Sequence, residues 1–279
     1  MKIFTRSLSY FITGAAILLS AGLTSCSKKA DLSSGDTPIV IPPKDTTAKP
    51  VYSLVWSDDF DGATIDETKW NFETGSLGVN NEKEYYQKAN AGIEDGNLVI
   101  TAKKETVNGF AYTSARMNTM GKFSQTYGRI EARIKVPMGQ GMWPAFWMLG
   151  DNINTVSWPQ CGELDIMEHV NATSTIYGTM HWNVNGHAQY GNTTQSTPGE
   201  YHLYAIEWDK NEIRWYVDSY LYQTGNIKDN VNTTGAFHLP FFIILNLAVA
   251  GDFPGANVDE SLLPEKMYVD YVKVYKQTN

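Results

Sequence analysis

The chain has 279 residues, of which 42% are hydrophobic and 13% aromatic, and its formal net charge is −8. An acidic surface repels polyphosphate, so nucleic acid is excluded as an expected partner and a neutral ligand is favoured. The only cysteines are Cys26 and Cys161, and the histidines show no metal-ligand spacing with cysteine or with one another. A disulfide framework and a zinc site are therefore not expected.

The N-terminus has the pattern of an export signal. Residues 1–25 carry the basic Lys2 and Arg6, then a short apolar run, then small residues. The run is too short for a transmembrane helix and fits a cleaved secretory signal. The sequence of residues 23–26, Leu-Thr-Ser-Cys, resembles a bacterial lipobox, which implies cleavage before Cys26 and lipidation of its sulfur. An ordinary signal peptide cut nearby is the alternative.

The next segment, residues 26–50, has the composition of a tether. It contains four prolines together with Ser, Thr, Asp and Lys, and little that could be buried. Such a segment is expected to be extended and mobile. We therefore expect an exported lipoprotein, anchored to a membrane by lipid on Cys26, in the periplasm or at the cell surface. Residues 51–279 have the length of a single all-β domain.

Hydrophobic residues in this domain recur with a period of two, which is typical of β-strands. In residues 129–136 the apolar side chains occupy one face and the charged ones the other, whereas residues 241–245 are continuously apolar. No window has a sustained helical period, so the expected fold is all-β, with two antiparallel sheets packed face to face. The clearest predicted strands are residues 97–101, 129–136, 162–169, 213–217, 241–245 and 268–275.

One predicted strand, residues 162–169, carries three acids among apolar residues. Glu163 and Asp165 share a face because strand side chains alternate. Glu168 is five residues from Glu163, so a regular strand would turn its carboxylate towards the apolar face, at a high cost in desolvation. One extra residue, a β-bulge near Ile166-Met167, returns Glu168 to the other face. The sequence therefore predicts a bulge and three carboxylates in a row.

Three clustered carboxylates have a chemical use. Their repulsion separates their pKa values, so one acid can stay protonated at neutral pH while another stays ionised. Glycoside hydrolysis needs this combination, with an acid for the leaving oxygen and a carboxylate for the anomeric carbon. The alternative is an exposed strand with solvated acids, which the regular apolar alternation disfavours.

Residues 163–168, Glu-Leu-Asp-Ile-Met-Glu, resemble the bulged Glu-x-Asp-x-x-Glu signature of glycoside hydrolase family sixteen, the laminarinase and lichenase group. Further matches span roughly residues 52–276. The resemblance implies a concanavalin A-like β-jelly-roll sandwich with a substrate cleft on its concave face. It implies a retaining endo-β-glucanase acting on β-1,3 or mixed β-1,3/1,4 glucans, in which Glu163 is the nucleophile, Glu168 the acid and base, and Asp165 tunes the protons.

The same resemblance implies residues that bind the glycan. Trp158 is expected to stack under the sugar at the cleavage point, and His181 to lie beside Asp165 if the return hairpin is tight. Phe253 stands where the family has tryptophan, and keeps a stacking face without the indole donor. Core packing, a polar turn, a surface salt bridge and a structural histidine are the alternative interpretations. The candidate substrate-binding residues are Asn80, Arg116, Trp143, Trp147, Trp158, His181 and Phe253.

No cofactor is expected for catalysis. Many family members hold one calcium ion on the convex side, and the matching positions are Asp59, the backbone of Gly96, and Asp270, unless these acids are ordinary surface groups. The expected partners are a β-glucan and, through the lipid, a membrane, and a monomer is expected.

Two other functions remain open. One is a family relative that cleaves agarose, carrageenan, a β-galactan or xyloglucan; the bulged motif disfavours xyloglucan and the acidic charge disfavours sulfated glycans. The other is a non-catalytic glycan-binding protein on the same sandwich. Such a protein would be expected to have lost one of the three acids, and all three are present.

Overall fold

The computed structural model describes residues 50–279. The expected signal peptide, Cys26 and the expected tether up to residue 49 lie outside the described residues. Within the described part, no helix is long and apolar enough to cross a membrane. Helical structure there is limited to four short segments: η1 (Lys88–Asn90), α1 (Ile153–Val156), η2 (Lys228–His238) and η3 (Glu260–Leu262).

The strands form two sheets, as the period-two pattern predicts. The larger sheet contains β15 (Tyr220–Asn226), β14 (Glu212–Val217), β13 (His202–Trp208), β8 (Gly128–Lys135), β17 (Glu265–Gln277), β5 (Asn97–Val107), β6 (Phe110–Ser114) and β3 (Glu84–Tyr86), with β1 (Tyr52–Asp58) paired to β17 and β4 (Ala91–Glu94) to β5. The smaller sheet runs in the order β12 (His187–Gln195), β11 (Thr175–Asn183), β10 (Glu163–Glu168), β9 (Met142–Gly150), β16 (Phe241–Val249), β7 (Arg116–Asn118) and β2 (Asn71–Phe72).

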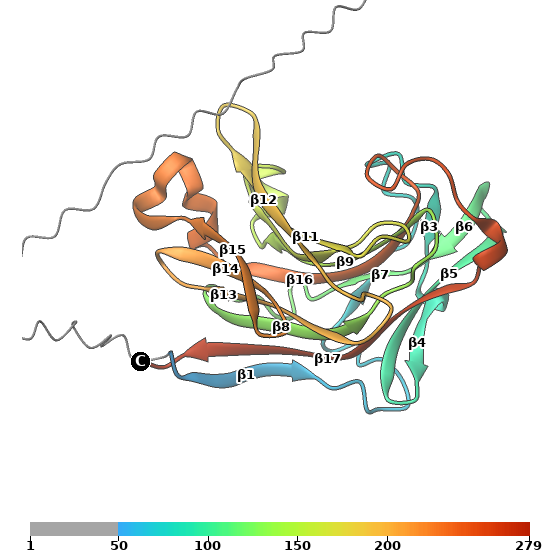
Figure 1. Cartoon of the computed structure of the whole chain (residues 1–279), viewed down its shortest axis with the longest axis horizontal. Helices are drawn as coiled ribbons and strands as arrows, with labels where there is room; N and C mark the ends of the chain where they lie inside the picture. The colour runs from blue at the N-terminus through green and yellow to red at the C-terminus, as the bar shows by residue number, and fades with distance from the viewer. Residues whose placement is uncertain (1–49) are drawn as a thin grey trace, which may run out of the picture. The chain divides into compact units, whose positions relative to one another are not determined.

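The two sheets are layered, with β12, β11, β9, β16 and β7 on one side and β8, β17 and β1 on the other (Figure 1). Every pairing is antiparallel except that of β3 with β6. Fully buried side chains fill the space between the layers, such as Ile130 and Ile134 of β8 and Phe146 and Met148 of β9. Strand β16, which begins with the apolar run 241–245, is buried at all nine positions and lies between β9 and β7 inside the smaller sheet. This is the β-jelly-roll sandwich that the sequence predicts.

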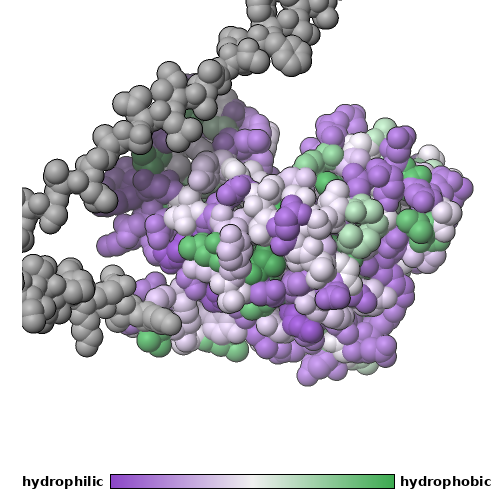
Figure 2. All heavy atoms as spheres, viewed as in Figure 1, coloured by the Kyte–Doolittle hydropathy of each residue, from purple (hydrophilic) through white to green (hydrophobic). Residues whose placement is uncertain are grey.

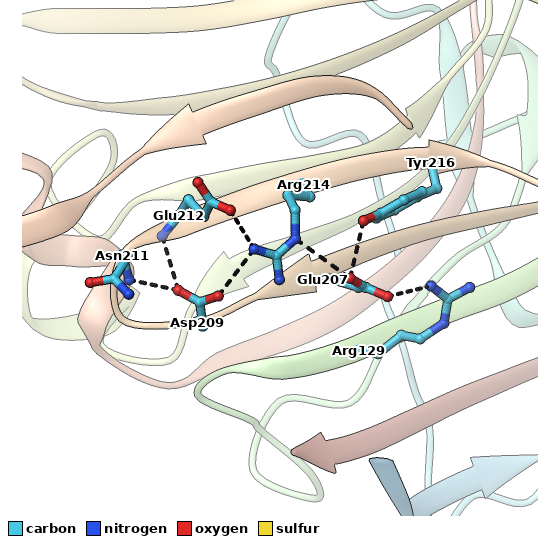
Figure 3. Close-up of polar contacts among 7 residues, drawn as sticks. All are labelled: Arg129, Glu207, Asp209, Asn211, Glu212, Arg214 and Tyr216. Atoms are coloured by element: carbon cyan, nitrogen blue, oxygen red, sulfur yellow. Dashed lines mark hydrogen bonds and ion pairs between the residues drawn. The ribbon is translucent and has the colours of Figure 1, made fainter. Parts of the chain in front are cut away.

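The outer face of the larger sheet is charged. Glu207 of β13 lies between Arg129 of β8 and Arg214 of β14 in register, and it accepts a 3.2 Å hydrogen bond from the Arg129 guanidinium (Figure 3). Asp209 and Tyr216 extend this network along the same strands. Surface residues in the view of Figure 2 are mostly hydrophilic, with hydrophobic groups small and scattered. The larger sheet thus carries a network of charged side chains on its outer face.

The two ends of the described chain meet in the larger sheet. Strand β1 pairs with β17 from Tyr52 opposite Gln277 to Asp58 opposite Val272, with one irregularity at Leu54. Beyond the strand, the backbone N–H of Thr278 donates a 2.9 Å hydrogen bond to the carbonyl of Val51.

The predicted bulge in β10 is confirmed. Against β9, Asp165 pairs with Trp147 and Met167 with Phe146, so two steps along β10 match one step along its neighbour. The register with β11 also shifts between Asp165 and Glu168. Ile166 is the extra residue, and it is buried in the core.

A tryptophan of the opposite sheet supports this irregularity. A bulge interrupts the hydrogen-bond ladder, and a buried backbone group that loses its partner there is costly. The indole Nε1–H of Trp215 in β14 donates a 2.8 Å hydrogen bond to the carbonyl of Asp165. The indole also lies against Gly178 of β11, where an added Cβ would be 2.7 Å from Trp215 Cδ1 and 2.2 Å from the Tyr222 hydroxyl. Glycine is therefore required opposite the bulge by close packing.

We predict that Gly178→Ala destabilises the fold by about 1–3 kcal/mol, because the added methyl overpacks the site behind the bulge. Urea denaturation would measure the change. Gly92→Ala in β4 is the matched control, since no atom lies within 4 Å of its added Cβ, and it should leave stability unchanged or slightly raised. Equal stability of the two variants would contradict the packing argument.

Candidate active site

The bulge brings the three acids to one groove over the smaller sheet. Two adjoining hollows, with volumes of about 490 and 630 Å³, share Glu163, Asp165 and Glu168 in their lining. The neighbouring strands β9 and β11 alternate between side chains that face the core and side chains that face this groove. All seven predicted substrate-binding residues line one or both hollows: Asn80, Arg116, Trp143, Trp147, Trp158, His181 and Phe253.

His181 lies beside the acids, as the tight return hairpin predicts. It pairs directly with Glu163 across the β10–β11 ladder, so both side chains project on the same face. Its Nε2 is 3.0 Å from Asp165 Oδ2 and 3.7 Å from Glu163 Oε1. Its Nδ1 lies 2.8 Å from Nε2 of His187, a residue of β12 that the sequence did not single out.

Burial governs the protonation of the acids. It raises the pKa of Glu163, Asp165 and Glu168 to about 8, and repulsion from Asp165 adds to the effect on the two glutamates. Electrostatic interactions with His181 and Arg116 oppose this rise at Glu163, and the interaction with His181 opposes it at Glu168 as well. The three carboxyl groups therefore share protons at neutral pH, and the Arg116 guanidinium favours the ionised form of Glu163.

The tryptophans of β9 support the acids as well as line the groove. The Nε1–H of Trp143 donates a 2.9 Å hydrogen bond to Glu168 Oε1, which favours the ionised form of this carboxyl. Trp147 donates through Nε1 to Asn246 at 2.7 Å, and its ring lies under the Arg116 guanidinium at 4.7 Å. A direct contact between Trp143 and Glu168 was not predicted from the sequence.

The other predicted binding residues have local partners. Arg116 is held by Glu73 at 3.0 Å, so its planar side chain forms a fixed part of the wall. Trp158 is 44% exposed, and its ring centre lies 4.7 Å from that of His187. Phe253 packs edge-on against Trp143, with 5.6 Å between ring centres. Trp158 is thus the most exposed aromatic face beside the acids and the best placed to stack on a sugar ring.

A pair of acids behind one border of the groove was missed by the sequence interpretation. Asn80 Nδ2 donates a 3.0 Å hydrogen bond to Glu82, and the fully buried Glu84 accepts 2.7 Å from the backbone N–H of Val249. Burial, followed by repulsion from Glu82, raises the pKa of Glu84 to about 8. These contacts link the loop that carries Asn80 to the end of β16.

The two carboxylates expected to bind calcium each lie beside a basic side chain. Asp59 forms a 2.8 Å ion pair with Lys273, and Asp270 forms a 2.7 Å ion pair with Arg133. Gly96 occupies a turn with φ of +72°. Each carboxylate therefore already has a basic partner, and the contacts give no support to a calcium site at these three positions.

Cys161 is a packed core residue rather than part of the groove. It is fully buried and free, and burial raises the pKa of its thiol to about 11. His169 is also buried, and its Nε2 lies 2.8 Å from the Thr173 carbonyl. Neither residue lines the groove.

An open groove on a β-sandwich, floored by adjacent carboxyl groups and walled by aromatic rings, defines a glycoside hydrolase. The family model for glycosyl hydrolases family 16 matches residues 79–273. The chain therefore belongs to glycosyl hydrolases family 16, and its reaction needs no cofactor.

Individual relatives agree with this assignment. The chain is 40% identical to a β-glucanase of Rhodothermus marinus over 81% of its own length and 86% of the relative's. It is 41% identical to the clotting factor G alpha subunit of Tachypleus tridentatus over 83% of its own length, but spans only 35% of that protein. The catalytic domain of a laminarinase from Thermotoga petrophila superposes with a TM-score of 0.75 and 43% identity, covering 82% of this chain and all of the other.

We predict that Glu84→Gln makes the fold less sensitive to alkaline pH. The folded pKa of Glu84 lies above its usual value of 4.5, so its contribution to stability is full below pH 4.5 and is lost as pH rises through about 8. The amide keeps an acceptor for Val249 and gains a donor towards Glu82. The variant should melt about 2–4 °C higher than the parent at pH 8.5, with a smaller gap at pH 5.

Melting temperatures measured across this pH range would test the prediction. Glu200→Gln is the control, because Glu200 is exposed, and its curve should follow the parent's. A constant difference between Glu84→Gln and the parent at every pH would show that the carboxyl does not titrate.

Proposed function

We propose that the protein is a retaining endo-β-glucanase that hydrolyses β-1,3 or mixed β-1,3/1,4 glucans by double displacement. The observation that carries the proposal is the bulge in β10, which sets Glu163, Asp165 and Glu168 in one open groove. The β-glucanase and laminarinase names of its relatives support the substrate class. The groove is open, which suits attack within a long chain.

In this mechanism, Glu168 is the general acid. Burial keeps its proton at neutral pH, and the proton passes to the glycosidic oxygen as the bond to the leaving sugar breaks. The Nε1–H of Trp143 then stabilises the new carboxylate through its hydrogen bond to Oε1. Glu168 can next act as a base and remove a proton from the incoming water.

Glu163 is the nucleophile. Its carboxylate attacks the anomeric carbon and forms a covalent glycosyl-enzyme, which water cleaves with overall retention of configuration. Asp165 and His181 lie directly beside Glu163. They can take up the proton and the charge that leave the two glutamates during the reaction. Trp158 supplies the exposed ring on which a sugar stacks at the point of cleavage.

The alternative substrates lead to a different product profile rather than a different mechanism. Agarose, carrageenan, β-galactan and xyloglucan are the other candidates. The acidic chain disfavours sulfated glycans, because like charges repel. A non-catalytic glycan-binding role is disfavoured by the complete set of acids and by the proton-retaining environment of Glu168.

We predict that Glu163→Gln and Glu168→Gln each lower kcat on laminarin by about 10³-fold or more, since each removes a group that changes its bonding or protonation in the reaction. Reducing-end release from laminarin, mixed-linkage barley glucan and the alternative polysaccharides would be assayed in parallel. The exposed Glu67→Gln should retain full activity. Substantial hydrolysis by either variant would overturn the assigned roles, and preferred cleavage of another glycan would overturn the substrate.

We further propose that the protein is exported, anchored through lipid on Cys26 and active as a monomer. Support for the anchor comes from the Leu-Thr-Ser-Cys pattern of residues 23–26 and the proline-containing segment after it. Lipid at this position would keep the groove near the membrane while the domain stays in water.

We predict that Cys26→Ser moves the protein from the membrane fraction to the soluble fraction of a bacterial host. Cys161→Ala, which changes the only other cysteine, should leave the distribution unchanged. Fractionation followed by detergent phase partitioning would measure this. Equal membrane retention of both variants would contradict the anchor.

A further inference from the structure

Three side chains on the floor of the groove have the arrangement of metal ligands. One donor atom from each of Glu163, Asp165 and His181 lies within 4.8 Å of the other two. His181 Nε2 lies 3.0 Å from Asp165 Oδ2 and 3.7 Å from Glu163 Oε1. These atoms come from adjacent strands, with His181 opposite Glu163 in register, so the backbone fixes their spacing. Glu168 is already engaged by Trp143 and stands apart from this set.

A buried oxygen in this set lacks a hydrogen bond. Asp165 is 96% buried, and among the described residues no donor forms a hydrogen bond to its Oδ2, although His181 Nε2 lies nearby. Leaving a buried acceptor unpaired is unfavourable, because the group has lost its hydrogen bonds to water. A cation bound at this point would satisfy the Oδ2 lone pairs.

The donor types and spacings suit a first-row transition ion. In a tetrahedral zinc site with bonds of about 2.0–2.1 Å, neighbouring donor atoms are about 3.4 Å apart, close to the spacings around His181 Nε2. An imidazole with two carboxylates favours such an ion over Ca²⁺, which takes oxygen ligands. The open groove leaves the fourth position to water.

His187 supplies the outer contact that a ligating histidine needs. A metal-bound imidazole usually donates its other N–H to an acceptor, which fixes its tautomer and ring orientation. His181 Nδ1 lies 2.8 Å from His187 Nε2, and the two rings stack with 5.1 Å between centres. With His181 Nε2 turned to an ion, its Nδ1–H donates to His187.

We propose that Glu163, Asp165 and His181 form an inhibitory site for a divalent transition-metal ion such as Zn²⁺. The ion binds to the same face of the acids that meets the glycan, so metal and substrate exclude each other. Metal binding itself depends only on these side chains, whereas its effect on hydrolysis rests on the proposed function.

The test uses the whole protein freed of metal by dialysis against a chelator. Calorimetry with Zn²⁺ and the visible spectrum of the Co²⁺ complex should both give one ion per chain. His181→Asn should weaken binding by at least 100-fold, and His187→Phe by 10- to 100-fold. The control is His202→Asn, because His202 makes a 2.9 Å contact with the single carboxylate of Asp218 outside the groove, and binding should not change.

Three outcomes would overturn the proposal: no saturable Zn²⁺ binding below 1 mM, equal affinity in His181→Asn and the parent, or equal weakening in His202→Asn. If His181→Asn fails to fold, Glu163→Gln replaces it in the test, because it removes another ligand with little change in side-chain shape. Zn²⁺ affinity equal to that of the parent would then overturn the proposal. The Co²⁺ spectrum needs no substrate, so a failed metal site and a failed glucanase assignment are told apart. A laminarin oligosaccharide should displace the ion from the parent.

Discussion

The site depends on a single hydrogen bond between the two sheets. At the bulge in β10, the Trp215 indole of the opposite sheet donates a 2.8 Å hydrogen bond to the carbonyl of Asp165. Space for the indole exists because Gly178 carries no side chain. Without this support, a regular register would turn Glu168 into the apolar core, where burying a charge is expensive. The same contact therefore joins the two sheets and supports the strand that carries the catalytic carboxylates.

In the groove, burial raises the pKa of the acids, and neighbouring groups lower the pKa of individual acids. Desolvation raises the pKa of all three acids, which alone would leave the nucleophile protonated. His181 favours the ionised form of both glutamates, whereas Arg116 acts on Glu163 and the Trp143 indole acts on Glu168. Two glutamates on one short strand thereby acquire different roles through their neighbours.

Much of this arrangement could be predicted from the sequence, because it follows from local periodicity. The odd spacing of Glu163 and Glu168 indicated a bulge, and the bulge in turn predicted the side on which His181 lies. The alternating runs also predicted the β-sandwich, and the continuously apolar run predicted its fully buried strand. These inferences need only the two-residue repeat of a strand and the cost of burying charge.

The remaining features could not be predicted, because they depend on how strands and sheets pack rather than on local periodicity. The contacts of Trp215 with Asp165 and of Trp143 with Glu168 depend on how the sheets and strands pack. His187 lacked any ligand spacing in the sequence, yet a hairpin sets it against His181. The acids expected to hold calcium, such as Asp270, instead pair with bases contributed by neighbouring strands.

The pairing of β1 with β17 has a mechanical consequence. Because the first described strand is paired along the last one, a force applied ahead of Val51 acts first on this ladder in the larger sheet. The acids belong to the other sheet, which is joined to this one through side-chain packing. The leading end of the domain is thus anchored to a different sheet from the one that carries the catalytic strand.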